Sequence, residues 1–481
     1  MAEGKGPDRG IDAARVAGLG EALAVLTPAL EAFVRRRAGA DSGRGERLAA
    51  LRTPLPARGL GSAEVLERLN ALIVDGLPIA APGFMAFVNS APPVVPSVAQ
   101  LVAAISAPSR WWSSPGAVLE ELAMSWLMEL FSWPTTGAGS LVSGGAVATL
   151  TALAAAREAA GARQGVDVGR DGVAALEKPR IYAGDNVHGV AGRALALLGL
   201  GRRALVTAPS SPSAGVKLDR LMGRIDQDRA EGCTAVAVIA TAGDASTGAI
   251  DDLPALVAAC RARGVWLHVD ASYGGFAIDD PRVAPRLAAL AEADSVVVDP
   301  HKWLAVPAGV GAVLVRERRA LSAALRLPSA AYLGGSGGES PFDLATGRPA
   351  WTPEHSAPAR GLVVWAALAE IGRDGLRARV SRHLDLARQV AARVQREPSL
   401  ELAADPVLST VVFRARGPDR DRLQVAVVRA VRARGRVIPS LTRVHGAPAI
   451  RACFLGVQNS EADADALVDE VLAVLPGLTE E

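Results

Sequence analysis

Short runs of β-branched residues alternate with longer alanine- and leucine-rich segments from about residue 82 to residue 360. The apolar runs are RIYAG, RALVTA, TAVAVIAT, VWLHVD, SVVVDP and GAVLVR. Strands that are apolar at almost every position are typical of a mainly parallel sheet with helices on both faces. The sequence therefore predicts an α/β fold built on such a sheet.

Different patterns flank this region on both sides. We expect an N-terminal helical segment over residues 1–82, with helices near 11–36 and 62–73, and a large domain over residues 83–360. Residues 361–481 combine a long amphipathic pattern, the strand STVVFRA and two further helical patterns. Together these indicate a smaller α+β domain at the C-terminus.

Composition argues against several classes of protein. Half of the 481 residues are hydrophobic and 21% are charged, which is typical of a compact globular chain. A net charge of +2 gives no electrostatic basis for binding nucleic acid or an anionic membrane surface. The three cysteines are far apart, and no stretch has the pattern of a signal peptide or a membrane-spanning helix. We expect a soluble, cytoplasmic protein without disulfides or a metal site.

Polar residues or glycines follow several of the apolar runs. Asp270 follows VWLHV, His301 and Lys302 follow SVVVDP, His188 follows RIYAGDNV, and the turn Ser143–Ala146 follows SLV and opens a helix. Ligands of an open α/β sheet bind beyond the carboxyl ends of its strands. These residues are therefore the candidate functional site.

The residue types match the needs of a pyridoxal-phosphate (PLP) site. Such a site needs a lysine amine that forms an imine, a carboxylate on the pyridine nitrogen, backbone N–H groups for the phosphate, and a ring stacked on the cofactor. The chain has only four lysines, Lys5, Lys178, Lys217 and Lys302, in a Lys+Arg total of 52. In a chain that uses arginine almost everywhere, a lysine at a strand end is an unusual choice for an ordinary solvated charge.

The motifs together resemble a known family. DPHKW preceded by HVDASYGG is the most specific signal, and PGFMAF, SSPGAVLEELAMSWL, LVSGGAVATLTALAAAR, VHGVAGRAL, ATAGDASTGAIDDL and PEHSAPARGLVVWAAL extend it. From about residue 82 onward, the chain is similar to the group II PLP-dependent decarboxylases of the aromatic-L-amino-acid (DOPA) decarboxylase type. The resemblance implies the fold type I, aspartate-aminotransferase-like architecture of PLP-dependent transferases.

The resemblance also implies roles for individual residues. Lys302 corresponds to the Schiff-base lysine, Asp270 to the partner of the pyridine nitrogen, and His188 to the residue stacked on the ring. His188 has the alternative of being an ordinary histidine at a helix start. Asp270 can also cap the turn that follows it, which is compatible with the functional role.

Further residues are expected around the cofactor. The resemblance places Gly145, Ala146, Asp299 and His301 near the phosphate, with Asp244 and Ser272 elsewhere at the cofactor. Tyr332 lies in the Gly/Ser-rich stretch RLPSAAYLGGSGGESPFD, which indicates a mobile loop. The resemblance makes Tyr332 the acid that protonates Cα after carbon dioxide leaves, in the neighbouring subunit's site. The alternative is a tyrosine packed on the surface.

The chain departs from the family pattern at several positions. Ala146 and Val147 stand where a hydroxyl and a glutamate often follow the paired glycines. Gly243-Asp244-Ala245 stands where the family has Gly-Thr-Thr near the cofactor. The Asp244 side chain could repel a substrate carboxylate or select a basic substrate, or it could point away from the site. Gly83 stands where aromatic-specific members of the family often carry an aromatic ring. These departures bear on dopa-like substrates more than on PLP chemistry.

We therefore expect a PLP-dependent carboxy-lyase that converts an L-amino acid to its amine and carbon dioxide through an external aldimine and a quinonoid. The family resemblance and the hydrophobic N-terminal region predict a homodimer with shared active sites. Two alternatives remain open. The same scaffold could couple decarboxylation to oxidative deamination and release an aldehyde, or the chain could bind PLP without turnover.

Overall fold

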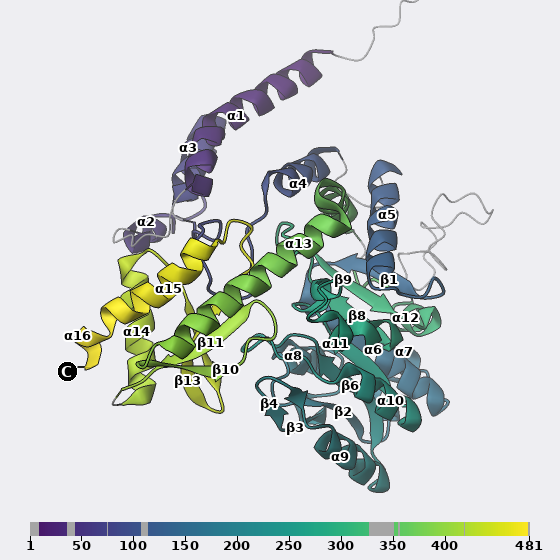
Figure 1. The fold of residues 1–481 in the computed structure, drawn as a ribbon. Coiled ribbons are helices and arrows are strands. Elements are labelled where there is room, and N and C mark those ends of the chain that lie inside the picture. Colours follow the sequence, from purple (N-terminus) through teal and green to yellow (C-terminus); the bar gives the residue numbers. More distant parts are fainter. Residues whose placement is uncertain are drawn as a thin grey trace, which may run out of the picture.

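The structure is a computed structural model of the chain, and it describes residues 9–35, 44–74, 76–106, 114–326, 351–354, 356–417 and 419–479. Figure 1 shows three parts. An N-terminal group of helices precedes a seven-stranded sheet with its helices, and a four-stranded sheet with its own helices completes the chain.

The N-terminal part consists of α1 Arg9–Arg35, α2 Arg44–Ala50 and α3 Ser62–Val74. The predicted helices near 11–36 and 62–73 are α1 and α3. These two helices lie side by side and stand apart from both sheets (Figure 1). Leu23 and Leu30 on α1 and Leu69 on α3 therefore remain 37%, 46% and 45% exposed.

The large sheet has the strand order β1-β9-β8-β7-β6-β2-β3. Its strands are β1 Ala138–Val142, β2 Pro179–Gly184, β3 Leu205–Ala208, β6 Thr234–Thr241, β7 Trp266–Asp270, β8 Ser295–Val298 and β9 Gly311–Val315. Pairing is parallel from β8 through to β3, and β9 is antiparallel to both β8 and β1. The predicted mainly parallel sheet is confirmed. A small hairpin of β4 Ser210–Ser211 and β5 Gly215–Val216 was not predicted.

Helices cover both faces of the large sheet. The helices of this part are α4 Val94–Ser106, which packs on α13, and α5 Ser114–Leu130, α6 Gly145–Arg163, α7 Val168–Asp171, α8 Val190–Leu197, α9 Leu218–Ala230, α10 Leu253–Arg263, α11 Ala284–Leu287 and α12 Arg318–Ala324. Short 3₁₀ turns lie at Val173–Ala175, Arg202–Ala204, Gly275–Ala277 and Ala288–Glu292. One core packs α6, α8 and α12 on one face, and a second packs α5, α9 and α10 on the other. Among the described residues, no helix has both the length and the apolar character needed to cross a bilayer.

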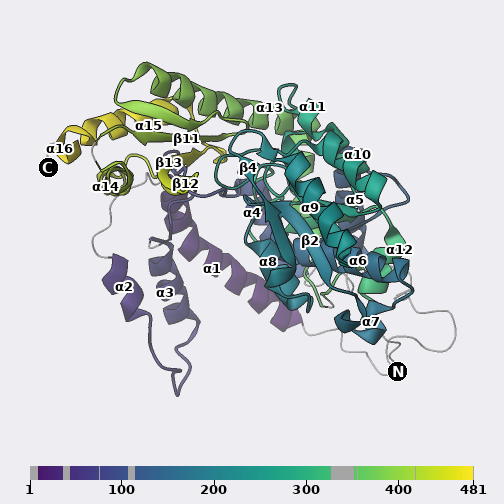
Figure 2. The same ribbon diagram turned by 90° about the horizontal axis from the view of Figure 1, so that it is seen from below.

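The C-terminal part is built on an antiparallel sheet of order β10-β11-β13-β12. Its elements are α13 Arg360–Arg396, β10 Leu400–Ala404, β11 Thr410–Ala415, α14 Arg420–Arg434, β12 Ser440–Val444, β13 Ala447–Cys453, α15 Glu461–Val474 and α16 Pro476–Thr479. Helix α13 is broken at Gly372, whose φ is 62°. It runs from this sheet across to α4 and α5 beside the large sheet (Figures 1 and 2), and so joins the two parts.

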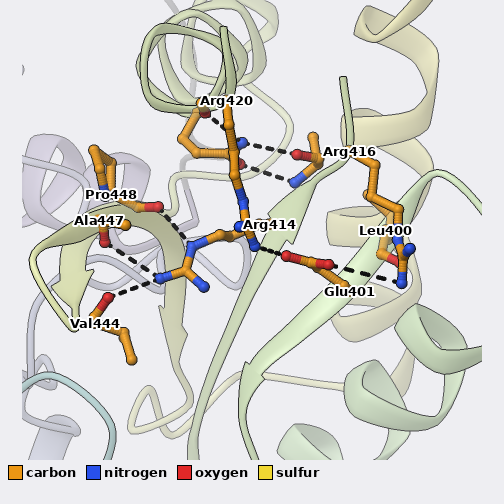
Figure 3. A network of polar contacts seen from close by, with 10 residues as sticks. Leu400, Glu401, Arg414, Arg416, Arg420, Val444, Ala447 and Pro448 are labelled. Carbon is orange, nitrogen blue, oxygen red and sulfur yellow. Dashed lines mark hydrogen bonds and ion pairs between the residues drawn. The ribbon is translucent and has the colours of Figure 1, made fainter. Parts of the chain in front are cut away.

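Arg414 on β11 holds the turn of the β12–β13 hairpin (Figure 3). Its Nε donates to the Pro448 carbonyl at 2.9 Å, and its Nη2 donates to the Val444 carbonyl at 2.9 Å. Burial lowers the pKa of Arg414, but a guanidinium stays charged in proteins, so these carbonyls stabilise a buried cation. The fixed hairpin matters for the site because its strand β13 carries Arg451.

Candidate active site

A cavity of about 400 Å³ lies at the carboxyl ends of β2, β6, β7 and β8. It brings together nearly all the residues predicted from the sequence, namely Gly145, Ala146, His188, Asp244, Asp270, Ser272, Asp299, His301 and Lys302. Tyr332 lies outside the described residues. A larger cavity of about 740 Å³ near the amino ends of β7 and β8 contains none of the predicted site residues.

Lys302 is held against the cavity wall by its own turn. Its Nζ lies 3.2 Å from Asp299 Oδ2, and its side chain is 18% exposed. The backbone N–H of Lys302 donates to the Asp299 carbonyl at 2.9 Å, and Ser90 Oγ donates to the Lys302 carbonyl at 2.6 Å. The turn after β8 therefore fixes an amine and a carboxylate beside each other.

His301 gives Asp299 a second basic neighbour. His301 Nδ1 lies 2.9 Å from the Val310 carbonyl, and because a carbonyl only accepts, this nitrogen carries a hydrogen. The other nitrogen, Nε2, lies 3.8 Å from Asp299 Oδ2. The remaining oxygen, Asp299 Oδ1, is buried without a hydrogen-bond partner among the described residues.

The start of helix α6 lies beside Asp299. Gly144 has a φ of 95°, a conformation that favours glycine. A Cβ at Gly145 would lie 2.7 Å from Asp299 Oδ2, so a side chain here would displace that carboxylate. The N–H groups of Gly145 and Ala146 begin the helix and have no preceding turn to supply carbonyl partners. Such groups form a site for an anion.

Asp270 and His188 each make the local contact that was the alternative to a role at the cofactor. Asp270 Oδ1 accepts a hydrogen bond from the Ser272 N–H at 3.1 Å, which caps the turn after β7. His188 Nδ1 accepts from the Val190 N–H at 3.3 Å at the start of α8. Both side chains also line the cavity, His188 at its exposed rim. The local contacts therefore leave both residues available to a ligand.

The Asp244 carboxylate is hydrogen-bonded within its own loop. Oδ1 accepts from the N–H groups of Ser246 and Thr247 at 2.6 and 3.0 Å. Oδ2 accepts from Thr247 Oγ1 at 2.5 Å and from the Ala249 N–H at 3.0 Å. With both oxygens engaged and the residue 5% exposed, Asp244 lines the cavity mainly as part of a closed turn.

Arg451 and Asn186 also line the cavity, although the sequence analysis did not single them out. Arg451 donates to the Ala245 carbonyl and, through Nε, to Ser440 Oγ at 3.0 Å. It is 8% exposed, and its side-chain hydrogen bonds within the described part of the chain go to a hydroxyl and a carbonyl rather than to a carboxylate. Asn186 Nδ2 is a buried donor without a partner among those same residues. An arginine inside the apolar run APAIRACF was the available signal for Arg451.

The cavity fits PLP. It combines a lysine amine, a carboxylate at a neighbouring strand end and the N–H groups at the start of a 19-residue helix. The orphaned donor Asn186 Nδ2 supports the same assignment. Buried polar atoms are rarely left without a partner, and an acceptor atom of PLP would satisfy this one.

Known proteins are similar to this chain in sequence and in fold. The family model described as the pyridoxal-dependent decarboxylase conserved domain matches residues 52–416, more than half of the chain. The aromatic-L-amino-acid decarboxylase of Bacillus atrophaeus is 29% identical over 443 residues, which cover 89% of each chain. The L-2,4-diaminobutyrate decarboxylase of Rhizobium meliloti (strain 1021) is 32% identical over 374 residues, which cover 76% of this chain and 72% of that protein. The crystal structure of Oryza sativa TDC with PLP and tryptamine has a TM-score of 0.86 at 23% identity, covering 99% of this chain and 100% of that one.

Proposed function

The chain belongs to the pyridoxal-dependent decarboxylase family, whose cofactor is PLP, and we propose that it converts an L-amino acid to its amine and carbon dioxide. One observation carries the proposal: Lys302, Asp270 and Arg451 line the same cavity. The amine suits the cofactor's aldehyde and the carboxylate suits its ring nitrogen. The guanidinium, which has no ion-pair partner among the described residues, suits a substrate carboxylate.

The residues around the cofactor would act as follows. When bound, PLP supplies an aldehyde carbon and an electron-withdrawing pyridine ring. Lys302 would hold the cofactor through that aldehyde, and the Asp270 carboxylate would keep a proton on the ring nitrogen. The N–H groups of Gly145 and Ala146 would hold the phosphate. His188, at the rim of the cavity, would lie against the ring.

Arg451 is the proposed anchor for the substrate carboxylate. A buried guanidinium without an anionic partner is costly, and a bound carboxylate removes that cost. Asp244 presents no free oxygen to oppose this anion, because its own loop occupies both. At position 83 a Cβ would meet the Arg436 carbonyl oxygen, so the backbone here has no room for a side chain.

Tyr332 is proposed to hold the proton that Cα receives after carbon dioxide leaves. The basis is its place in the Gly/Ser-rich loop and the family resemblance, since the residue lies outside the described part of the chain. A phenol on a closing loop is a suitable acid for this step. Delivery of this proton by Tyr332 would favour the amine over the aldehyde as the product.

The reaction itself gives the first test. Purified protein loaded with PLP is expected to absorb visible light and to release amine and carbon dioxide in equal amounts from at least one L-amino acid. A panel of aromatic, basic and diamino acids, assayed for amine, aldehyde and peroxide, makes the measurement. Aldehyde with peroxide would indicate the oxidative alternative. Bound PLP without carbon dioxide release from any substrate would contradict the proposed activity.

A homodimer is proposed from the apolar surface of the N-terminal helices and α4. Val94, Val98 and Ile105 on α4 are 74%, 52% and 47% exposed, in addition to the leucines of α1 and α3. Apolar surface of this extent marks an association site. We expect a dimer mass by analytical ultracentrifugation at micromolar concentration. A fully active monomer under those conditions would contradict the shared-site proposal.

A further inference from the structure

The turn that carries Lys302 continues into a strained and fully buried stretch of backbone. Ala305 has a φ of 57° and is 0% exposed, and its N–H donates to the Lys302 carbonyl at 3.1 Å. A residue with a Cβ keeps such a conformation only where the surrounding contacts hold it. Several of the contacts that hold this turn come from α13, the helix that joins the two sheets.

His383 on α13 binds the side chain that follows Lys302. Trp303 is 0% exposed, and its Nε1 donates to His383 Nδ1 at 3.1 Å. The other ring nitrogen, His383 Nε2, lies 3.1 Å from the Gly456 carbonyl, and because a carbonyl only accepts, Nε2 carries the hydrogen. His383 therefore links the Lys302 turn to the chain that follows β13, the strand that carries Arg451.

The surroundings of His383 keep its ring neutral. Burial lowers the pKa of His383 to about 3, the charges of Arg382 and Arg379 lower it further, and the hydrogen bond to Gly456 acts in the opposite direction. At neutral pH the ring is uncharged, so Nδ1 stays an acceptor for Trp303. Both ring nitrogens of this buried histidine are then satisfied.

Arg379 lies one helical turn before His383, on the same face of α13. Its Nη1 donates to the Trp303 carbonyl and to the Leu304 carbonyl, at 3.3 Å each. Helix α13 thus contacts both the backbone and the side chain of the residues that follow Lys302. The site side of the turn is held by Ser90, whose Oγ donates to the Lys302 carbonyl.

We propose that His383 and Arg379 are positioning residues for Lys302: they fix the turn from which its amine reaches the aldehyde of the cofactor. The inference rests on the proposed role of Lys302. The groups assigned to the ring nitrogen and the phosphate lie on β7 and α6, whereas the turn after β8 is held from α13. A reacting amine must meet the aldehyde in a narrow range of geometries, so a small displacement of its turn is costly.

Two ligands separate lysine positioning from general damage to the site. The Lys302 amine adds to the aldehyde carbon of PLP, and one water leaves as the carbon–nitrogen double bond forms. Pyridoxamine phosphate has the same ring and phosphate but carries an amine in place of the aldehyde, so it does not bond to Lys302. A misplaced lysine should therefore weaken the binding of PLP alone, whereas a damaged site should weaken the binding of both ligands.

Four variants test the contacts of α13. His383→Leu leaves the buried Trp303 Nε1 without its acceptor, while His383→Gln retains an acceptor and a donor on a side chain of similar reach. Arg379→Met removes the donor to the two carbonyls and keeps the apolar stem. Val390→Ala is the matched control, because Val390 is buried on the same helix in the core of the second sheet.

The experiment measures the dissociation constants of PLP and pyridoxamine phosphate, the fraction of PLP fixed by borohydride at saturation, and thermal unfolding of the apo form. We expect His383→Leu to raise the PLP dissociation constant by roughly tenfold, the scale seen when the partner that orients a ligating group is lost. That of pyridoxamine phosphate should be unchanged. Arg379→Met should change the ratio in the same direction, and His383→Gln should restore most of it. Val390→Ala should lower the melting temperature and leave both constants unchanged.

The two ligands also distinguish the possible failures. Equal weakening of both ligands in His383→Leu, or no weakening of either, would overturn the inference and leave the proposed function standing. Equal affinity of the wild type for the two ligands, with no PLP fixed by borohydride, would count against the proposed role of Lys302 itself. If His383→Leu does not fold, Trp303→Phe replaces it, since this change keeps an aromatic ring against Tyr273 and removes the donor. An unchanged ratio of the two constants in both Trp303→Phe and Arg379→Met would then overturn the inference.

Discussion

Replacing Asp270 with alanine is expected to lower the rate of decarboxylation by roughly a hundredfold or more, the usual cost of losing a key electrostatic group. Without the carboxylate, the ring nitrogen of PLP loses the negative partner that keeps it protonated. The fold should persist, because within the described part of the chain the Asp270 side chain makes a single hydrogen bond, from the Ser272 N–H at 3.1 Å. The measurement is kcat with an accepted substrate, together with circular dichroism and the melting temperature.

Two further variants isolate the charge. Asp270→Asn keeps the shape and the acceptor for Ser272, so it should match alanine in activity and the wild type in stability. Asp251→Asn is the matched control at the same sheet edge but outside the cavity. The Asp251 carboxylate accepts from the N–H groups of Val216 and Thr241 at 2.6 Å each, so this variant should lose stability and keep its kcat. Near-normal kcat in both Asp270 variants would contradict the assigned role.

Most of the central sheet could be predicted because six of its seven strands are local apolar runs, while β1 was noted only as the short run SLV. The run TAVAVIAT is β6 to the residue, and VWLHVD contains all of β7. A parallel sheet brings the carboxyl ends of its strands to one edge, whatever the details of helix packing. Asp270, Lys302 and His188 therefore share a cavity that their separation in sequence conceals.

Contacts that depend on the second sheet were not predictable in the same way. Arg451 reaches the cavity only because α13 joins the two sheets and Arg414 fixes the β12–β13 turn. Strands β10, β12 and β13 were missed, since polar residues interrupt LELAA and SLTRV. The four hydrogen bonds that occupy Asp244 arise from the conformation of its loop, which no motif encodes. The role of Tyr332 stays a prediction.

Lys302→Ala is expected to lower turnover by roughly a thousandfold or more, as when a covalent catalyst is removed, and to abolish borohydride-stable attachment of PLP. Some of this loss has a second cause. The change also removes the partner of Asp299 and leaves a buried carboxylate beside the start of α6. Alanine alone therefore does not separate the covalent role of the lysine from its ion pair.

Lys302→Arg makes that separation. A guanidinium retains a positive charge for Asp299 but does not bond to an aldehyde, so PLP should still bind without becoming fixed by borohydride. Lys178→Arg is the control, because Lys178 is exposed and its Nζ donates to the Glu231 carbonyl at 3.2 Å, away from the cavity. It should retain wild-type turnover and covalent labelling. Peptide mapping after reduction is expected to find the cofactor on Lys302 in the wild type and in Lys178→Arg. Label on Lys178 or Lys217 would refute the assignment. Full activity in Lys302→Arg would also refute it, because the ion pair with Asp299 would then account for the whole role of this lysine.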